Sequence, residues 1–401
     1  MIDFPHLKDI CQSTKSKIIM LVVDGLGGLA DPNTGKSELQ MANIPNLDKL
    51  ASMSACGLTT PVLPGITPGS GPGHLALFGY DPITYLIGRG VLEALGIGVD
   101  LKKGDIAARG NFCTVDSSGD LVDRRAGRIK TEESGPLCQI LDKIDIPDLD
   151  IQILPVQDYR FVTLFRGTGL KSNVTETDPQ RLGVPPRKVE AVDKQSAKTS
   201  DAANALVNYA SHVLGNRDNA NGILLRGFSE LPELPDFGVG YQLDPAAIAA
   251  YPMYRGLAKV AGMTVIPTGP NFKAELETMT LNYANHDFFY IHYKPADAAG
   301  EDGDFQAMVV ALEELDKLIP DLVALKPETL VIAGDHSTPS ILGGHGWQPV
   351  PLLVNSRYTP GEGVHSFDEY AFRYGSLGII KATEVMLLAL AHADKLIKFG
   401  P

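Results

Sequence analysis

The stretch Thr329-Leu-Val-Ile-Ala-Gly-Asp-His-Ser337 decides the fold class of this chain. Its apolar run, Leu330–Ala333, is too short for an isolated helix and ends at a glycine, which is typical of a buried strand in a parallel sheet. Ligands of open α/β sheets gather beyond the carboxyl ends of such strands. Asp335 and His336 stand at that position, as either a metal-binding pair or a capped loop. Gly334 permits the sharp turn that one ion would require of two adjacent side chains.

Two further apolar runs lead into acidic residues. Lys17–Val23 runs straight into Asp24, and Phe288–His292 is soon followed by Asp297. Since the carboxyl ends of parallel strands meet at one edge of a sheet, these carboxylates are predicted to converge with Asp335. A capped turn is the alternative interpretation of Asp24. The alternation of strand and helix patterns predicts an α/β fold, with a mostly parallel sheet flanked by helices.

The middle of the chain has long polar loops and short strands. A chain of 401 residues is expected to hold more than one core. We therefore predict a discontinuous core of residues 1–110 and 240–401, and a smaller inserted α+β domain over residues 111–239. Hinges near 108–117 and 236–242 would let the two domains close.

Two helices are expected in the second part of the core besides the amphipathic one at Phe305–Ile319. Pro245–Val260 is predicted to be helical, with a break or restart near Pro252. Thr383–Phe399 is predicted to form a closing amphipathic helix.

Composition excludes several classes of partner. The formal charge of −13 argues against nucleic acid and anionic membranes. No apolar segment reaches the length of a membrane span, and the beginning of the chain does not resemble a signal peptide. The four cysteines are far apart in the sequence, which suits reduced thiols. We expect a cytoplasmic protein that acts on a small molecule. The sequence is compatible with a homo-oligomer.

A Gly/Pro-rich loop, Pro64–His74, leads into the apolar run Leu75–Tyr80. This places Ser70 near a helix N-terminus, where the dipole and free N–H groups favour an anion or an alkoxide. Ser70 is therefore either a functional residue or a helix cap, and the density of glycine favours function. His74 either touches substrate or packs within the helix.

The predicted insert is rich in arginine, with three in the run Arg124–Arg128. Guanidinium groups bind carboxylate and phosphate oxygens through two parallel hydrogen bonds. A solvated basic face is the alternative. The candidate substrate-binding residues are His74, Arg109, Arg125, Arg128, Arg226 and Lys294.

Carboxylates and imidazoles accumulate around the predicted strand ends. Asp297 and Glu301 are spaced to share one side of a helical turn, and His345 lies in a glycine-rich approach to a strand. Mixed Asp, Glu and His sets suit Mn²⁺ or Zn²⁺ better than Ca²⁺ or Mg²⁺ alone. The set is too large for one ion and fits two, an arrangement suited to in-line phosphoryl displacement. The candidate ligands are Asp24, Ser70, Asp297, Glu301, Asp335, His336 and His345.

Over nearly its whole length the chain resembles the archaeal-type cofactor-independent phosphoglycerate mutases, a branch of the alkaline-phosphatase superfamily. The resemblance implies an alkaline-phosphatase-like core with an inserted domain and two divalent metal ions. It implies Ser70 as the phosphorylated nucleophile, and no 2,3-bisphosphoglycerate. One metal would be held by Asp24, Ser70, Asp335 and His336, and the other by Asp297, residue 301 and His345. The motifs that carry the resemblance are Val23–Gly25, Pro68–Ser70, His74–Pro82, Gly88–Gly90, Asp123–Arg128, Asp297–Gly300, Gly334–His336 and Pro349–Pro351.

One position departs from the family pattern, since many relatives carry histidine where this chain has Glu301. A carboxylate is a harder ligand than imidazole, so we expect Mn²⁺, or Mg²⁺, to be favoured over Zn²⁺. Alternatively, Glu301 faces solvent and leaves a weaker second site.

The reaction that the resemblance implies is the interconversion of 3-phosphoglycerate and 2-phosphoglycerate through a phosphoserine. A metal-dependent phosphomonoester hydrolase or another phosphomutase on the same core is the nearest alternative. A catalytically idle, metal-stabilised anion-binding protein is an alternative from a different class, and the intact Ser70 with a full ligand set speaks against it.

Overall fold

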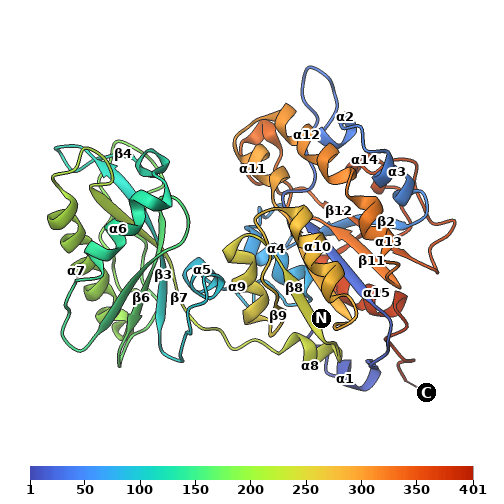
Figure 1. Ribbon diagram of the computed structural model, residues 1–401, viewed down its shortest axis with the longest axis horizontal. Helices are drawn as coiled ribbons and strands as arrows, with labels where there is room; N and C mark the ends of the chain where they lie inside the picture. Colours follow the sequence, from blue (N-terminus) through green and yellow to red (C-terminus); the bar gives the residue numbers. More distant parts are fainter. Residues whose placement is uncertain (401) are drawn as a thin grey trace. The chain divides into compact units, whose positions relative to one another are not determined.

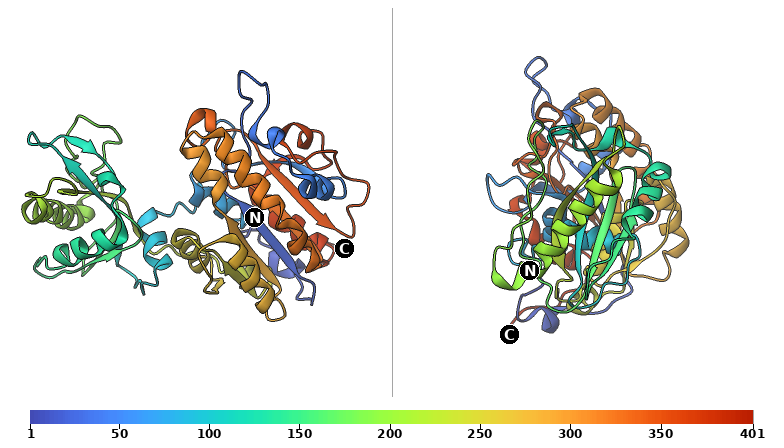
Figure 2. Two further views of the ribbon diagram at one scale, coloured as in Figure 1. Left: turned by 45° about the horizontal axis from the view of Figure 1, so that its top comes forward. Right: turned by 90° about the vertical axis from the view of Figure 1, so that its left-hand side faces the viewer.

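The structure is a computed structural model that describes residues 1–400, and the chain forms two compact units. Unit 1 consists of Met1–Leu86, Leu234–Tyr251 and Ala261–Pro401. Unit 2 consists of Ile87–Glu233 together with Pro252–Val260. Figures 1 and 2 show both units, each built from a sheet and helices.

The boundaries of unit 2 differ from the expected 111–239, because it begins earlier and takes in a remote helix. Helix α5 (Arg89–Gly96) packs against helix α9 (Pro252–Val260) through glycine. A Cβ on Gly96 would lie 1.8 Å from the carbonyl oxygen of Pro252. A Cβ on Gly256 would lie 1.8 Å from that of Leu92. This close backbone contact joins segments that are far apart in the sequence, so composition alone did not reveal it.

The sheet of unit 1 has eight strands, and most neighbouring pairs are parallel, which confirms the predicted α/β class. One strand, β12, runs antiparallel to both of its neighbours. Every residue of the central strand β1 is buried, because helices cover both faces of the sheet. In sheet order the strands are β13 (Gly378–Lys381), β2 (Ala55–Thr60), β12 (Val350–Ser356), β11 (Thr329–Ala333), β1 (Ile18–Val23), β10 (Phe288–Tyr293), β8 (Pro245–Ile248) and β9 (Thr264–Val265).

The alternation of side chains along β10 shows how the two faces are covered. Phe289 and Ile291 join the main core with apolar residues of α3, α10, α12 and α13. Tyr290, on the opposite face, contacts the ring of Phe78 just after α4. The helices of unit 1 are α1 (Leu7–Ile10), α2 (Glu38–Met41), α3 (Pro45–Ala51), α4 (Ser70–Leu77), α8 (Phe237–Tyr241), α10 (Phe272–Asn282), α11 (Pro295–Glu301), α12 (Phe305–Asp316), α13 (Ile319–Ala324), α14 (Glu369–Phe372) and α15 (Val385–His392), with 3₁₀ turns at Ser340–Leu342 and Ala382–Glu384.

Two of the expected helices need correction. Pro245–Ile248 is strand β8 rather than helix, and only Pro252–Val260 is helical. Pairing with β10 in the buried sheet overrides the weak helical pattern of this short segment. The closing helix is confined to Val385–His392, and the residues beyond it form a turn and a bridge to the first helix region.

Unit 2 holds a five-stranded sheet with helices α6 and α7 on one face. Alternate residues of the long strand β3, such as Ala108 and Phe112, pack into that helical core. Arg109 and Asn111 therefore belong to the other face of the sheet. The elements of unit 2, besides α5 and α9, are β3 (Ile106–Val115), β4 (Leu121–Asp123), β5 (Asp150–Pro155), β6 (Arg160–Arg166), β7 (Gly222–Glu230), α6 (Thr131–Leu141) and α7 (Ala197–Leu214), with 3₁₀ turns at Ala126–Arg128 and Lys194–Ser196.

None of the helices within residues 1–400 is both long enough and apolar enough to span a membrane.

Candidate active site

The predicted acidic residues converge at one edge of the unit 1 sheet. Strand β1 lies between β10 and β11 and is parallel to both, with Ile18 opposite Phe288 and Thr329. The three strands therefore end side by side. Asp24 directly follows β1, and Asp335 follows β11 after one glycine.

Asp24, Asp335 and His336 form a fully buried group that could hold one metal ion. Nε2 of His336 lies 3.3 Å from Oδ1 of Asp24 and 3.2 Å from Oδ2 of Asp335. The backbone N–H of Gly25 donates to the other oxygen of Asp335. The adjacent pair Asp335 and His336 thus turns toward one point, as the glycine before it allows.

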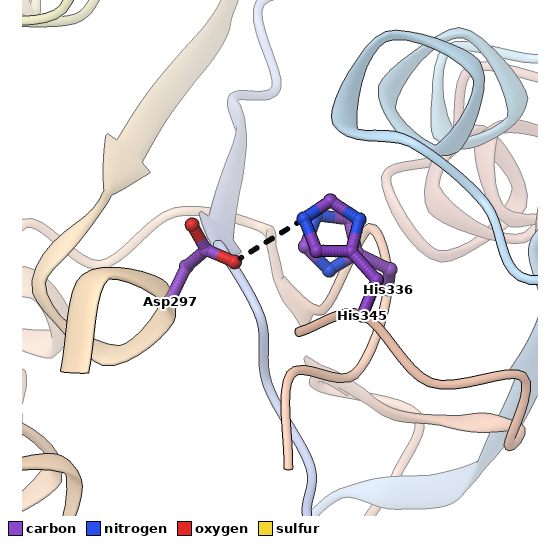
Figure 3. A group of neighbouring side chains, drawn as sticks. All are labelled: Asp297, His336 and His345. Carbon is purple, nitrogen blue, oxygen red and sulfur yellow. Dashed lines mark ion pairs between the residues drawn. The ribbon is translucent and has the colours of Figure 1, made fainter. Parts of the chain in front are cut away.

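Asp297, His336 and His345 form a second group of the same kind, and His336 belongs to both. Figure 3 shows the Asp297 carboxylate facing the two imidazole rings. The rings are stacked, with centroids 3.6 Å apart, and Nε2 of His345 lies 3.7 Å from Oδ1 of Asp297. Thr338 donates to Oδ1 of Asp297 over 2.7 Å and lies 3.1 Å from Nδ1 of His336, so it fixes both side chains.

Glu301 lies at the rim of the second group. It ends α11, one turn after Asp297, but its side chain is 56% exposed whereas Asp297 is fully buried. Its Oε1 lies 3.8 Å from Nε2 of His345. Burial would lower the pKa of His345, but the nearby Glu301 carboxylate and the carbonyl oxygen of Pro68 outweigh it and raise that pKa to about 9.

Ser70 is the first residue of α4, as predicted, and its Oγ lies 3.1 Å from Nε2 of His336. The hydroxyl therefore adjoins the imidazole that the two groups share. Glycine lets the helix approach the end of β11, because a Cβ on Gly73 would lie 2.2 Å from the carbonyl oxygen of Asp335. The main-chain N–H groups of this helix start favour negative charge at the hydroxyl.

His74 takes the packed position of its two predicted alternatives. It is fully buried, and its Nδ1 lies 2.8 Å from the carbonyl oxygen of Ser70 and 3.1 Å from Oδ2 of Asp335. It thus links the helix that carries the serine to a candidate ligand.

Lys294 and His292 approach the second carboxylate oxygen of Asp24, Oδ2. Nζ of Lys294 lies 3.0 Å from Oδ2 of Asp24 and also donates to Asp297. Nε2 of His292 lies 3.2 Å from the same Oδ2. Burial would raise the pKa of Asp24, but Lys294 and His292 outweigh it and hold that pKa well below its usual range.

The donor set fits divalent metal ions. Buried carboxylates and imidazoles with ligand atoms within 4.8 Å of one another are costly to assemble without a cation. Burial and the nearby Asp24 raise the pKa of Asp297, as expected of like charges brought together. The sequence-based prediction missed His292 and Thr338. The available signal was a polar residue, His292, within an otherwise apolar strand.

The predicted arginines belong to unit 2. Arg109 is buried, with Nε 4.0 Å from Oε1 of Glu93. It lies opposite Arg226 in the antiparallel pair of β3 and β7. Arg125 and Arg128 are exposed, on a turn whose residues Ala126 to Arg128 all have positive φ. Such strain in residues other than glycine is concentrated at functional sites.

Comparisons with known proteins identify the family of this chain. The family model described as 2,3-bisphosphoglycerate-independent phosphoglycerate mutase matches residues 51–219. A Thermus thermophilus protein named as a probable 2,3-bisphosphoglycerate-independent phosphoglycerate mutase is 47% identical, over 99% of each chain. A Thermotoga petrophila protein of the same name is 52% identical, over 96% of each chain.

Two solved structures share the fold. A Pyrococcus horikoshii protein superposes with a TM-score of 0.83 at 27% identity, covering 97% of this chain and 100% of its own. The cofactor-independent phosphoglycerate mutase of Thermoplasma acidophilum gives a TM-score of 0.66 at 28% identity, covering 94% of this chain and 100% of its own. With its full-length relatives, the chain belongs to the family of 2,3-bisphosphoglycerate-independent phosphoglycerate mutases.

Proposed function

We propose that this chain interconverts 3-phosphoglycerate and 2-phosphoglycerate through a phosphoserine at Ser70, with two divalent metal ions, most readily Mn²⁺. The reaction belongs to glycolysis and gluconeogenesis. The observation that carries the proposal is the place of the Ser70 hydroxyl, 3.1 Å from the imidazole shared by two Asp/His groups. A nucleophile beside two metal groups is the arrangement that in-line phosphoryl transfer requires.

Asp24, Asp335 and His336 would hold one ion, and Asp297 and His345 would hold the other with Glu301 at the rim. Bound ions would lower the pKa of the serine hydroxyl and offset the charge of the phosphoryl group. His336 is a candidate ligand of both ions, because its imidazole belongs to both groups.

In the proposed reaction the phosphoryl group is transferred twice, first to Ser70 and then back to glycerate. Ser70 Oγ forms a bond to phosphorus as the ester bond to glycerate breaks, and the serine proton passes overall to the departing oxygen. The neighbouring glycerate hydroxyl then attacks phosphorus, the Ser70 ester breaks, and the proton returns. Lys294 has its ammonium between Asp24 and Asp297, which suits it to stabilise negative charge on the transferring group.

The arginines of unit 2 would bind the carboxylate of glycerate and keep it from escaping between the transfers. Arg109, Arg125, Arg128 and Arg226 retain this proposed role, whereas buried His74 would position the Ser70 helix rather than touch substrate. Planar guanidinium groups match a carboxylate better than lysine does.

Isotopic crossover tests the retention of glycerate. The holoenzyme is given unlabelled 3-phosphoglycerate in the presence of excess carbon-13 glycerate, and 2-phosphoglycerate is analysed by mass spectrometry. Unlabelled product is expected, because the same glycerate takes back the phosphoryl group. Labelled 2-phosphoglycerate at the isotope ratio of the pool would contradict retention.

Glu301 is expected to bias the second group toward harder ions. Replacing Glu301→His should lower the affinity for Mn²⁺ relative to Zn²⁺, measured by competitive metal titration of the stripped protein. Glu301→Gln is the matched control, since it keeps an oxygen ligand without the charge. A rise in the preference for Mn²⁺ over Zn²⁺ in Glu301→His would show that the carboxylate does not set it.

A further inference from the structure

Asp178 is a buried carboxylate of unit 2 that lies outside the metal groups. It sits in the loop between β6 and α7, and its side chain is fully buried. Two backbone hydrogen bonds of the preceding Thr177 hold this loop, one to Leu225 of β7 and one from Arg187. These hydrogen bonds fix the loop that carries the carboxylate.

Two guanidinium groups from different strands converge on Asp178. Arg124, just after β4, donates from Nε and Nη2 to the two carboxylate oxygens, over 2.8 and 2.7 Å. Arg226 of β7 donates from Nη1 to Oδ2 over 3.4 Å. The backbone N–H of Gln180 completes the set at Oδ1. One carboxylate therefore fixes the plane of Arg124 through two parallel hydrogen bonds and also contacts Arg226.

The side chains of Arg124 and Arg226 are partly exposed, although that of Asp178 is buried. Arg124 is 27% exposed and Arg226 is 33% exposed. The fork that binds Asp178 uses Nε and Nη2 of Arg124, so Nη1 takes no part in this pair. Each guanidinium group thus contacts Asp178 while part of its side chain stays accessible to another anion.

The backbone beside Arg226 is irregular, which affects the direction of its side chain. The pairing of β3 with β7 shifts register next to Arg226, at Gly227, whose φ is +60°. Glu176 accepts from the N–H of Gly227 over 2.8 Å and lies 3.4 Å from Nε of Arg226. Bulges of this kind re-aim a side chain and are common beside active sites.

We propose that Asp178 is a positioning residue that holds Arg124 and Arg226 as a preorganised pair for the carboxylate of the substrate. The inference rests on the proposed function and adds Arg124, which was not among the predicted substrate-binding residues. Preorganised side chains give up less conformational freedom when the ligand binds.

Charge and geometry predict opposite effects of Asp178→Asn. Removing a negative charge beside two arginines would by Coulomb attraction alone strengthen the binding of any anion. Loss of the fork, which needs both carboxylate oxygens, would release Arg124 and weaken the binding of a carboxylate. The sign of the change in affinity therefore separates the two effects.

The test uses full-length Mn²⁺-loaded protein with Ser70→Ala, which removes turnover. Calorimetry measures the affinity for 3-phosphoglycerate and for sn-glycerol 3-phosphate, a phosphate ester without a carboxylate. Adding Asp178→Asn is expected to weaken the binding of 3-phosphoglycerate on the order of tenfold. This corresponds to the loss of about one charged hydrogen bond. Binding of sn-glycerol 3-phosphate and of Mn²⁺ should hardly change. Asp201→Asn, an exposed acid on α7, is the control.

Arg124→Lys provides a second variant if Asp178→Asn does not fold. It keeps the charge but not the fork, so it should cause a similar loss, and the double variant should lose little more. Tighter or unchanged binding of 3-phosphoglycerate, an equal loss for both ligands, or additive losses would overturn the proposal. Equal affinity of the Ser70→Ala parent for both ligands would instead contradict the proposed substrate.

Discussion

Ser70→Ala is expected to abolish the interconversion of 3-phosphoglycerate and 2-phosphoglycerate, by a factor on the order of 10⁴ or more in kcat. The variant lacks the oxygen that receives the phosphoryl group, and the hydroxyl lies 3.1 Å from the imidazole shared by both groups. The fold should persist, because the residue is half-buried and its carbonyl, which His74 contacts, is retained. Steady-state kinetics and thermal unfolding measure the two properties.

Thr67→Ala is the matched control, since it removes a hydroxyl from an exposed position of the same loop. It should retain near-normal activity. Substantial mutase activity in Ser70→Ala would rule out Ser70 as the nucleophile, whatever the effect on metal binding.

His336→Ala is expected to impair both metal groups together, because its imidazole belongs to both. Loss of a residue that merely supports a ligand costs about 10–100-fold in metal affinity, so loss of a shared ligand should cost on the order of 100-fold or more at each group. His345→Ala should impair only the group that contains Asp297. Calorimetric titration of the stripped variants with Mn²⁺ separates the two outcomes.

His365→Ala, which removes an exposed imidazole, should bind Mn²⁺ as the parent protein does. If His336→Ala kept one class of sites at its original affinity, the shared imidazole would serve a single ion.

Strands β1, β10 and β11 were predictable because each is a short apolar run that is soon followed by an acidic residue. Asp24 directly follows such a run, and Asp335 and His336 follow another after one glycine. Parallel pairing of the two strands brings these residues together. The class of fold and the start of the Ser70 helix followed from the same local patterns.

Features that depend on distant packing were not predictable. His292 is hidden in a fully buried strand, and its contact with Asp24 exists only because β10 pairs with β1. The boundary of unit 2 depends on the glycine contact of α5 with α9. Asp178 resembled an ordinary loop acid, because the arginines that define its surroundings lie on remote strands.

The most direct test of the account follows the products formed from 3-phosphoglycerate by phosphorus NMR. The protein is stripped of metal, reloaded with Mn²⁺ and assayed without 2,3-bisphosphoglycerate. We expect 2-phosphoglycerate to appear with little free phosphate, and no reaction before metal is restored. Free phosphate as the main product would show that the phosphoryl group passes to water and that the chain is a phosphohydrolase rather than a mutase.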